Sequence, residues 1–333
     1  MLKKISLFFV RLFFIVIILS FLAGFSLYYS KKNPDSDVAK LIRKAQIITI
    51  NYLHLAMWFE YDEWTIHKLS VDMSDIKNIK IKKIETIDLL KSNIFDVYDP
   101  IYYKDGFAYE RCGYDRGIHF CDNVFVPTEG KSFNRLNPNC KTSYPISFIL
   151  DKTEYWLFEE YFCKEGLKLY KRINNKFEVV TKITELNVFD PTPIVINNVV
   201  YVFGTVPKSG LMLWEVKKVG TKWNSKLDKR SPVSTRPDSN RFGGNIFHWE
   251  GKIYGAIMDN SEFYGKSLGL YEIDLFNSKK ILIKVTENLL PSLQADKYHT
   301  FSIGNCTEDK ICEALIDLAT KKRQPFHGSK YYN

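Results

Sequence analysis

The chain has 333 residues and a formal net charge of +9. Its length is large for one ordinary domain but normal for a barrel or a propeller. The basic residues are spread along the chain, and the only short clusters, KNIKIKKIE and TKKR, contain no aromatic residues for base stacking. Sites for single-stranded nucleic acid combine both kinds of side chain, so the composition argues against nucleic acid as a partner and indicates a solvated basic surface.

Residues 1–30 predict a cytoplasmic stub and an uncleaved transmembrane signal anchor. Basic residues up to Arg11 precede an uncharged run from Leu12 to Tyr29, which is about as long as a helix that crosses a bilayer. A cleaved signal peptide is the alternative, but its apolar region is usually shorter and ends in a small-x-small site. The basic N-terminal flank favours a cytoplasmic N-terminus, although the lysines at 31–32 weaken the asymmetry. The bulk of the chain is therefore expected outside the cytoplasm, in a periplasm, at a cell surface or in a secretory lumen.

Residues 31–62 are expected to form a spacer, whose apolar positions fit helical and extended periods equally well. From Trp64 onward, short apolar strands alternate with tight turns such as Lys104–Gly106 and Asn197–Asn198, and no long amphipathic helix separates them. This pattern predicts an all-β fold.

Five strand openings recur at spacings of roughly 45 to 55 residues, which is in the range of propeller blades. They lie at Asp99–Pro100, Tyr144–Pro145, Asp190–Pro191, Gly243–Gly244 and Tyr298–His299. The predicted fold is a five-bladed β-propeller over residues 63–325, followed by a tail at 326–333. The strand WTIHKL would close the ring against the last blade, whose final strands would be ICEALIDL and a TKKR edge. A β-sandwich with coincidental spacing is the alternative.

The six cysteines allow fifteen pairings. Their spacing favours disulfides that join Cys112 to Cys121, Cys140 to Cys163 and Cys306 to Cys312, as expected in an oxidising compartment. A metal site is the alternative, but no C-x-x-C motif occurs and no histidine lies at ligand spacing, so no metal site is predicted.

A series of short motifs follows in order from Trp64 to about Arg323. They are W-x-I at Trp64–Ile66, D-P at Asp99–Pro100 with a return strand ending at Glu110, S-Y-P at Ser143–Pro145, the acidic Glu159 before LKLYKR, D-P at Asp190–Pro191, R-x-G-G-x-I-F at Arg241–Phe247, G-x-I-Y at Gly251–Tyr254, D-x-S-x-x-Y-G at Asp259–Gly265, and YHTFSI with His299. In this order the motifs resemble the N-terminal propeller domain of glucosamine inositolphosphorylceramide transferases and of their bacterial relatives in cell-surface polysaccharide loci.

The resemblance implies a five-bladed propeller that binds or processes a glycan or glycolipid at its central funnel, in cell-envelope or surface-polysaccharide metabolism. A non-catalytic glycan-binding or scaffold module is the alternative. The chain departs from the family at Gly255 and Met258, where the family usually has Arg and Gln, and at Phe158, where it has Pro. The chain ends soon after the fifth expected blade, so glycosyl transfer in the manner of the full-length plant enzyme is not implied.

The expected fold also resembles the propellers of arabinanases and β-xylosidases, in which carboxylates from different blades meet in the funnel. Glycoside hydrolysis needs a protonated acid and a second carboxylate, and Asp99, Glu159 and Asp190 are the catalytic candidates. Each has a structural alternative. An Asp before Pro commonly caps a turn or strand start, and Glu159 could face solvent if its neighbour Glu160 faces inward, because side chains alternate along a strand.

Five further residues are expected to bind the ligand: Glu110, Tyr144, Arg241, Asp259 and His299. Tyr144 would offer a stacking face to a sugar, and Arg241 would pair with a funnel carboxylate or an acidic glycan group. His299 would bind a ligand or cation on the channel axis. The corresponding structural alternatives are blade packing, a surface salt bridge and a hydrogen-bonded core histidine. No cofactor is expected, apart from room for a structural cation in the channel.

Overall fold

The computed structural model describes residues 58–89, 95–115, 118–129, 131–135, 142–160, 163, 165–174, 176–276, 280–293 and 295–325. The chain divides into two compact units. The larger comprises Tyr61–Tyr114 and His119–Lys322, and the described part of the smaller consists only of strand ends. The predicted anchor, most of the spacer and the tail lie outside the described residues. Within those residues, no helix has the length and apolar character needed to cross a membrane.

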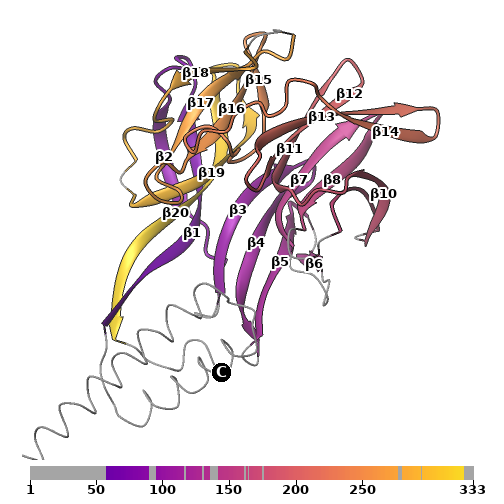
Figure 1. Cartoon of the computed structure of the whole chain (residues 1–333). Coiled ribbons are helices and arrows are strands. Elements are labelled where there is room, and N and C mark those ends of the chain that lie inside the picture. Colours follow the sequence, from indigo (N-terminus) through magenta and orange to yellow (C-terminus); the bar gives the residue numbers. More distant parts are fainter. Residues whose placement is uncertain are drawn as a thin grey trace, which may run out of the picture. The chain divides into compact units, whose positions relative to one another are not determined.

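The described strands form five antiparallel four-stranded sheets, the blades of a propeller (Figure 1). Blade 1 contains β3 (Phe95–Tyr103), β4 (Gly106–Asp115), β5 (Ile118–Pro127) and β6 (Phe133–Arg135). Blade 2 contains β7 (Ser143–Leu150), β8 (Thr153–Glu159), β9 (Leu167–Ile173) and β10 (Lys176–Thr184). Blade 3 contains β11 (Phe189–Ile196), β12 (Val199–Val206), β13 (Gly210–Val219) and β14 (Lys222–Leu227). Blade 4 contains β15 (Phe247–Trp249), β16 (Lys252–Asp259), β17 (Ser267–Ile273) and β18 (Leu282–Thr286). Blade 5 contains β19 (Lys297–Cys306), β20 (Ile311–Pro325), β1 (Trp58–Asp72) and β2 (Lys80–Thr86).

The two ends of the propeller sequence share blade 5, whose strand order is β19-β20-β1-β2. The predicted closure by WTIHKL is therefore confirmed, and β1 begins earlier than expected, at Trp58. The expected division of ICEALIDL and TKKR into two strands is wrong, because no turn residue interrupts the continuous strand β20. The outer edge is β2 instead, and its largely exposed lysines discourage pairing with another chain.

Apolar clusters lie between adjacent blades. One contains Leu157 and Leu169 of blade 2 together with Trp214 of blade 3, and another contains Phe203 of blade 3 and Ile257 of blade 4. Each blade is thus covered on both faces by its neighbours, which explains why strands such as β8 and β12 have apolar residues in nearly continuous runs.

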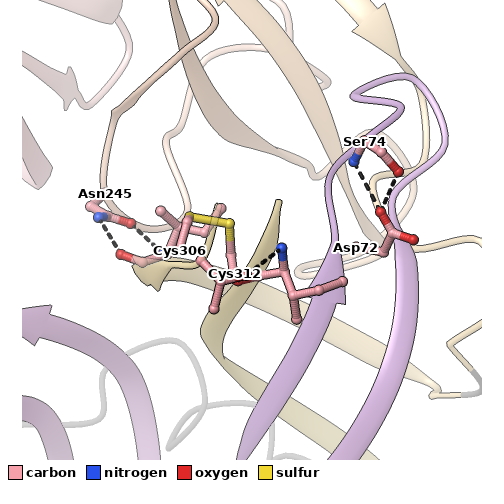
Figure 2. The surroundings of a disulfide bond; sticks show 8 residues. Asp72, Ser74, Asn245, Cys306 and Cys312 are labelled. Carbon is pink, nitrogen blue, oxygen red and sulfur yellow. Dashed lines mark hydrogen bonds between the residues drawn. A yellow bond between two sulfur atoms is a disulfide. The ribbon is translucent and has the colours of Figure 1, made fainter. Parts of the chain in front are cut away.

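Two of the predicted disulfides are present in the described residues. Cys112–Cys121 joins β4 to β5 with a Cα–Cα distance of 4.1 Å. Cys306–Cys312 joins β19 to β20 across their hairpin, with 4.0 Å between the Cα atoms (Figure 2). Cys163 is also disulfide-bonded, and its predicted partner at position 140 lies outside the described residues.

Blade 4 opens with two glycines that allow a close approach to β19. A Cβ atom on Gly243 would lie 2.0 Å from the carbonyl oxygen of His299, and one on Gly244 would lie 1.9 Å from that of Phe301. Gly244 also has a φ of 112°, which disfavours other residues. Asn245 completes the contact with two hydrogen bonds to Ile303. Its side-chain oxygen accepts one from the N–H of Ile303 at 2.8 Å, and its side-chain amide donates one to the carbonyl of Ile303 at 2.9 Å (Figure 2).

Candidate funnel site

Inner strands of the propeller carry equivalent bulges at the predicted openings. Asp99, Tyr144 and Asp190 have φ angles of 48°, 46° and 44°, and each lies at a register shift between the first and second strands of its blade. In β19 the same kind of shift includes His299. A bulge redirects a side chain away from the regular strand alternation. The four openings therefore share a β-bulge, which directs their side chains away from the regular alternation of the inner strands.

Asp317 on β20 organises the side of the site formed by blades 5 and 1. It is 0 % exposed. Its Oδ2 atom accepts a hydrogen bond from the backbone N–H of Asp99 at 2.9 Å and lies 2.6 Å from Nδ1 of His299. Its Oδ1 atom accepts from the backbone N–H groups of His299 at 3.2 Å and Thr300 at 2.9 Å. The sequence analysis missed Asp317, although it is the only charged residue in the run ALIDLA.

The imidazole of His299 is held in place by its neighbours. Its ring stacks on Trp64 with centroids 4.4 Å apart, and the edge of Tyr264 approaches at 5.2 Å. Burial lowers the pKa of His299, but the carboxylates of Asp317 and Asp99 outweigh it, and the pKa lies above its usual value. His299 is therefore a buried imidazole paired with Asp317. It is both a residue of the site and a hydrogen-bonded core residue, which were its two predicted alternatives.

Asp99 and Glu110 form a carboxyl pair within blade 1. Burial raises the pKa of Glu110 well above its usual value. The charge of Asp99, to which Glu110 is hydrogen-bonded, raises it further. Burial also raises the pKa of Asp99, whose Oδ1 accepts a hydrogen bond from the hydroxyl of Thr300 at 2.6 Å. This pair therefore retains a proton at pH values where an exposed carboxyl would have lost it.

Glu159, Asp190 and Arg241 form the opposite side of the site. Arg241 donates to both carboxylate oxygens of Asp190, through Nε and, at 3.0 Å, through Nη2. The same Nη2 atom lies 3.9 Å from Oε2 of Glu159, which accepts the backbone N–H of Asp190 at 3.2 Å. Burial, and then the charge of Asp190, raises the pKa of Glu159 well above its usual value, although Arg241 partly opposes this. A proton-retaining acid thus lies beside a carboxylate that is paired with arginine.

The capping and solvent alternatives for these acids are not what the structure shows. The hydrogen bonds described for the Asp99 and Asp190 carboxylates come from side chains, those of Thr300 and Glu110 for Asp99 and that of Arg241 for Asp190, and not from the backbone of their own turns. Glu159 and Glu160 are both buried. Glu160 follows the end of β8, so strand alternation no longer applies to it, and it accepts hydrogen bonds from the hydroxyl of Tyr170 at 2.7 and 2.8 Å.

Tyr144 spans the inner strands instead of offering a sugar-stacking face. It is 1 % exposed. Its hydroxyl accepts from the N–H of Gly244 at 2.8 Å, donates to the same residue's carbonyl at 3.0 Å, and lies 3.1 Å from Oγ1 of Thr192. The expectation of stacking at Tyr144 is therefore wrong, because this ring is enclosed and its hydroxyl ties blade 2 to blade 4.

The motif around Asp259 contributes a different residue from the expected one. Asp259 accepts the N–H of Ser261 at 2.8 Å and lies 3.7 Å from Lys266, so it caps its own loop. Tyr264 of the same motif reaches the site: it contacts His299, and the guanidinium of Arg241 lies 5.2 Å from its ring centroid. The residue is 43 % exposed. Tyr264 belongs to the D-x-S-x-x-Y-G motif of the sequence, but it was not predicted as a site residue.

We use the name funnel cluster for Asp99, Glu110, Glu159, Asp190, Arg241, His299 and Asp317. Their electrostatic influence extends across the blades, since the charge of Asp190 affects Asp99, Glu110 and Glu159. Possible metal-ligand atoms of Asp99, His299 and Asp317 lie within 4.8 Å of one another. Nδ1 of His299 is engaged with Asp317 in this arrangement, so binding a cation through that nitrogen would require this contact to break.

The sequence matches no described protein family and no curated protein. The propeller has structural neighbours among glycoside hydrolases. An α-L-arabinofuranosidase, PaAbf62A of Podospora anserina, is 8 % identical with a TM-score of 0.45, and the match covers 72 % of this chain and 94 % of that one. The catalytic domain of a Coprinopsis cinerea GH62 α-L-arabinofuranosidase is 6 % identical with a TM-score of 0.44, and the match covers 69 % of this chain and 93 % of that one. A sialidase of Trypanosoma rangeli is 12 % identical with a TM-score of 0.44, and the match covers 73 % of this chain and 50 % of that one.

Proposed function

We propose that this protein is a membrane-anchored, extracytoplasmic propeller that binds a glycan at the funnel cluster and acts on a glycosidic bond, in cell-envelope or surface-polysaccharide metabolism. The proposal rests on one observation: the carboxyl groups of Glu159 and Asp190 are neighbours in different environments. Burial favours the protonated form of Glu159, while Arg241 binds and neutralises Asp190. Two neighbouring carboxyl groups in such different environments are suited to different roles in acid–base catalysis.

The chemistry would be hydrolysis or transfer by paired carboxyl groups. Glu159 would donate its proton to the glycosidic oxygen as the bond to the anomeric carbon breaks. Asp99, whose raised pKa makes it a stronger base than an exposed Asp, would accept the proton of the attacking water or hydroxyl, whose oxygen forms the new bond. Asp190, whose charge Arg241 offsets, would accept a hydrogen bond from a sugar hydroxyl through a remaining lone pair.

Tyr264 would provide the apolar contact for the sugar. Its ring lies beside His299 and Arg241, and the residue as a whole is partly exposed, so Tyr264 would contact the C–H face of a pyranose or furanose ring. This role replaces the one expected for Tyr144.

A relation to the propeller domain of glucosamine inositolphosphorylceramide transferases is part of the proposal and rests on the order of the sequence motifs. It makes a glycolipid or a membrane-attached glycan the favoured ligand. The predicted anchor at residues 1–30 would keep the propeller near such a ligand, with its disulfides in an oxidising compartment.

A non-catalytic glycan-binding or scaffold module is the second candidate. The observation that favours it is the burial of Asp99, Glu110, Glu159 and Asp190, which are between 2 % and 8 % exposed. In a binding module these groups would mainly hold the bulges in position, and their remaining lone pairs would accept sugar hydroxyls.

The test is a substrate screen with a matched pair of variants. The purified full chain is incubated with a panel of aryl glycosides and surface oligosaccharides, and released sugar is measured. Glu159→Gln should lower turnover by about 10²- to 10⁴-fold, as expected for loss of a general acid. Glu160→Gln changes an equally buried neighbour that binds Tyr170, and it should retain activity.

Binding on a glycan array separates the two candidates. Glycan binding that depends on Tyr264, with no turnover on any substrate, would support the binding module. If the chain neither bound nor cleaved any glycan, or if Glu160→Gln lost as much turnover as Glu159→Gln, the role assigned to the funnel cluster would be wrong.

A further inference from the structure

A cavity of about 330 Å³ lies at blade 4 and the segment that precedes it, and its lining contains no residue of the funnel cluster. Part of its wall comes from β17 and β18, the outer strands of blade 4, and part from the segment that connects blade 3 to blade 4. The funnel cluster is built mainly at the inner strands. The cavity lining contains no residue of the funnel cluster, so each site can be altered by its own substitutions.

Four basic side chains line this cavity: Arg230, Arg236, Lys280 and Lys284. None of its described lining residues is acidic. Acidic residues next to the lining hold the two arginines. Arg230 donates to Asp228 at 2.9 and 2.7 Å, and Arg236 donates to Asp238 at 3.1 and 2.5 Å. The Asp238 carboxylate also accepts a hydrogen bond from the hydroxyl of Ser239 at 3.1 Å. The four basic lining residues outnumber these two carboxylates, an arrangement suited to binding an anion.

Arg236 and Lys284 are the two cations best placed to bind a ligand. The bonds from Arg236 to Asp238 use Nε and Nη2, which leaves the Nη1 amino group outside them. Nζ of Lys284 lies 3.8 Å from Asp238 and 3.6 Å from Glu287, beyond good hydrogen-bond distance. It also lies 5.7 Å from the ring centroid of Tyr271. Both cations can thus turn donors toward an oxyanion without losing a short ion pair.

The remainder of the wall is suited to a sugar. The hydroxyls of Ser234 and Ser239 lie 2.8 Å apart, and the hydroxyl of Tyr271 reaches the backbone of Asp238 at 3.3 Å. Val233 and Leu282 add apolar surface. A cavity of this size with hydroxyls, apolar groups and a few charges is typical of a small-ligand site. Sugar hydroxyls would pair with the serines, and the C–H face would contact the apolar side chains.

We infer that this cavity binds an acidic sugar, a saccharide unit that carries a carboxylate or a phosphate. The inference rests on the proposed function in taking the ligand to be a saccharide, and it adds that the glycan is anionic. The cavity would hold a unit of the chain apart from the one acted on at the funnel cluster. Two contacts on one glycan would raise its overall affinity without changing the chemistry of the funnel.

The test is titration of the full chain with glucuronic acid, glucose 6-phosphate, glucose and inorganic phosphate, followed by ligand-observed NMR. Both acidic sugars should bind, glucose should not, and raising the salt concentration should weaken the binding. Arg236→Gln and Lys284→Gln should each weaken the binding about tenfold, as expected for loss of a charge-assisted contact. Lys252→Gln is the matched control, because Lys252 is a cation on the same blade that pairs with Glu272 at 2.8 Å and does not line the cavity.

Several outcomes would overturn the inference. They are failure of both acidic sugars to bind, equal binding of glucose, equal weakening by Lys252→Gln, or inorganic phosphate binding as tightly as glucose 6-phosphate. Glu159→Gln separates this result from the fate of the proposed function. If that funnel variant abolished acidic-sugar binding while Arg236→Gln did not, the sugar would lie in the funnel and the cavity inference alone would fail. Binding that depends on Arg236, in a protein without glycan turnover, would leave the cavity inference standing and count against the proposed enzyme.

Discussion

Oδ2 of Asp317 lies 2.6 Å from Nδ1 of His299 and accepts the backbone N–H of Asp99 at 2.9 Å. One buried carboxylate therefore fixes the bulge of blade 1 and the imidazole of blade 5 together. Since β1 and β2 complete the same blade, the position of this pair depends on closure of the ring. The site is consequently sensitive to the stability of the whole propeller.

Stability should fall as the pH rises above about 4. Asp99, Glu110 and Glu159 have pKa values above their usual range, so the folded chain binds their protons more tightly than the unfolded chain. Their stabilising contribution is complete below the unfolded pKa of about 4 and is lost as the pH rises through the folded values. The raised pKa of His299 acts in the same direction above about pH 6.5. Urea unfolding at a series of pH values measures the effect.

Glu110→Gln provides the check on that assignment. A carboxamide resembles the protonated acid, so this variant should unfold with a weaker pH dependence and be more stable than the wild type at about pH 8. A profile that is unchanged in Glu110→Gln would show that this carboxyl does not retain its proton.

Tyr144→Phe should destabilise the propeller. The substitution removes the hydroxyl that binds both backbone groups of Gly244, and leaving buried partners unsatisfied costs about 1–3 kcal/mol. Tyr201→Phe, on the partly exposed face of β12, should change the free energy of unfolding by less than about 0.5 kcal/mol. Chemical denaturation of both variants gives the comparison, and equal losses would contradict the bridging role of Tyr144.

Removal of the first strand should open the ring. A chain that begins after His67 lacks most of β1, so the edge of β20 in blade 5 would be unpaired. Its thermal unfolding should be shifted far below that of the full chain or become non-cooperative. A chain that begins after Asp37 keeps all of β1 and should unfold like the full protein. Equal melting temperatures for the two truncations would argue against closure through blade 5.

Tyr264→Ala should weaken glycan binding about tenfold or more, because it removes the aromatic face beside His299. Tyr264→Phe should retain most of the affinity, since the ring remains. The neighbouring Phe263 has a similar exposed fraction, 45 % against 43 %, but it contacts Lys297 instead of the funnel cluster. Affinities for a glycan found on the array test this difference, and an equal loss in Phe263→Ala would show a general surface effect.

The sequence by itself determined the blade count, the closing strand and two of the disulfides. These features are local or repeated. An Asp-Pro, Tyr-Pro or Gly-Gly opening, followed by a strand, a turn and a return strand, is specified within about fifteen residues by turn chemistry and strand preference. The WTIHKL strand could be assigned to the last blade because a ring with unpaired edges is unfavourable.

Only the tertiary structure decided how the openings are used. Thr300 and Asp99 are 201 positions apart, and Asp317 and Asp99 are 218 apart, yet both pairs are hydrogen-bonded. The direction of Tyr144 toward Gly244 and of Tyr264 toward His299 likewise depends on how neighbouring blades pack. The pKa shifts follow from the same packing, because burial is the first cause for Asp99, Glu110 and Glu159. Local sequence sets the conformation of each blade, but burial and charge pairing exist only after the blades close around a common centre.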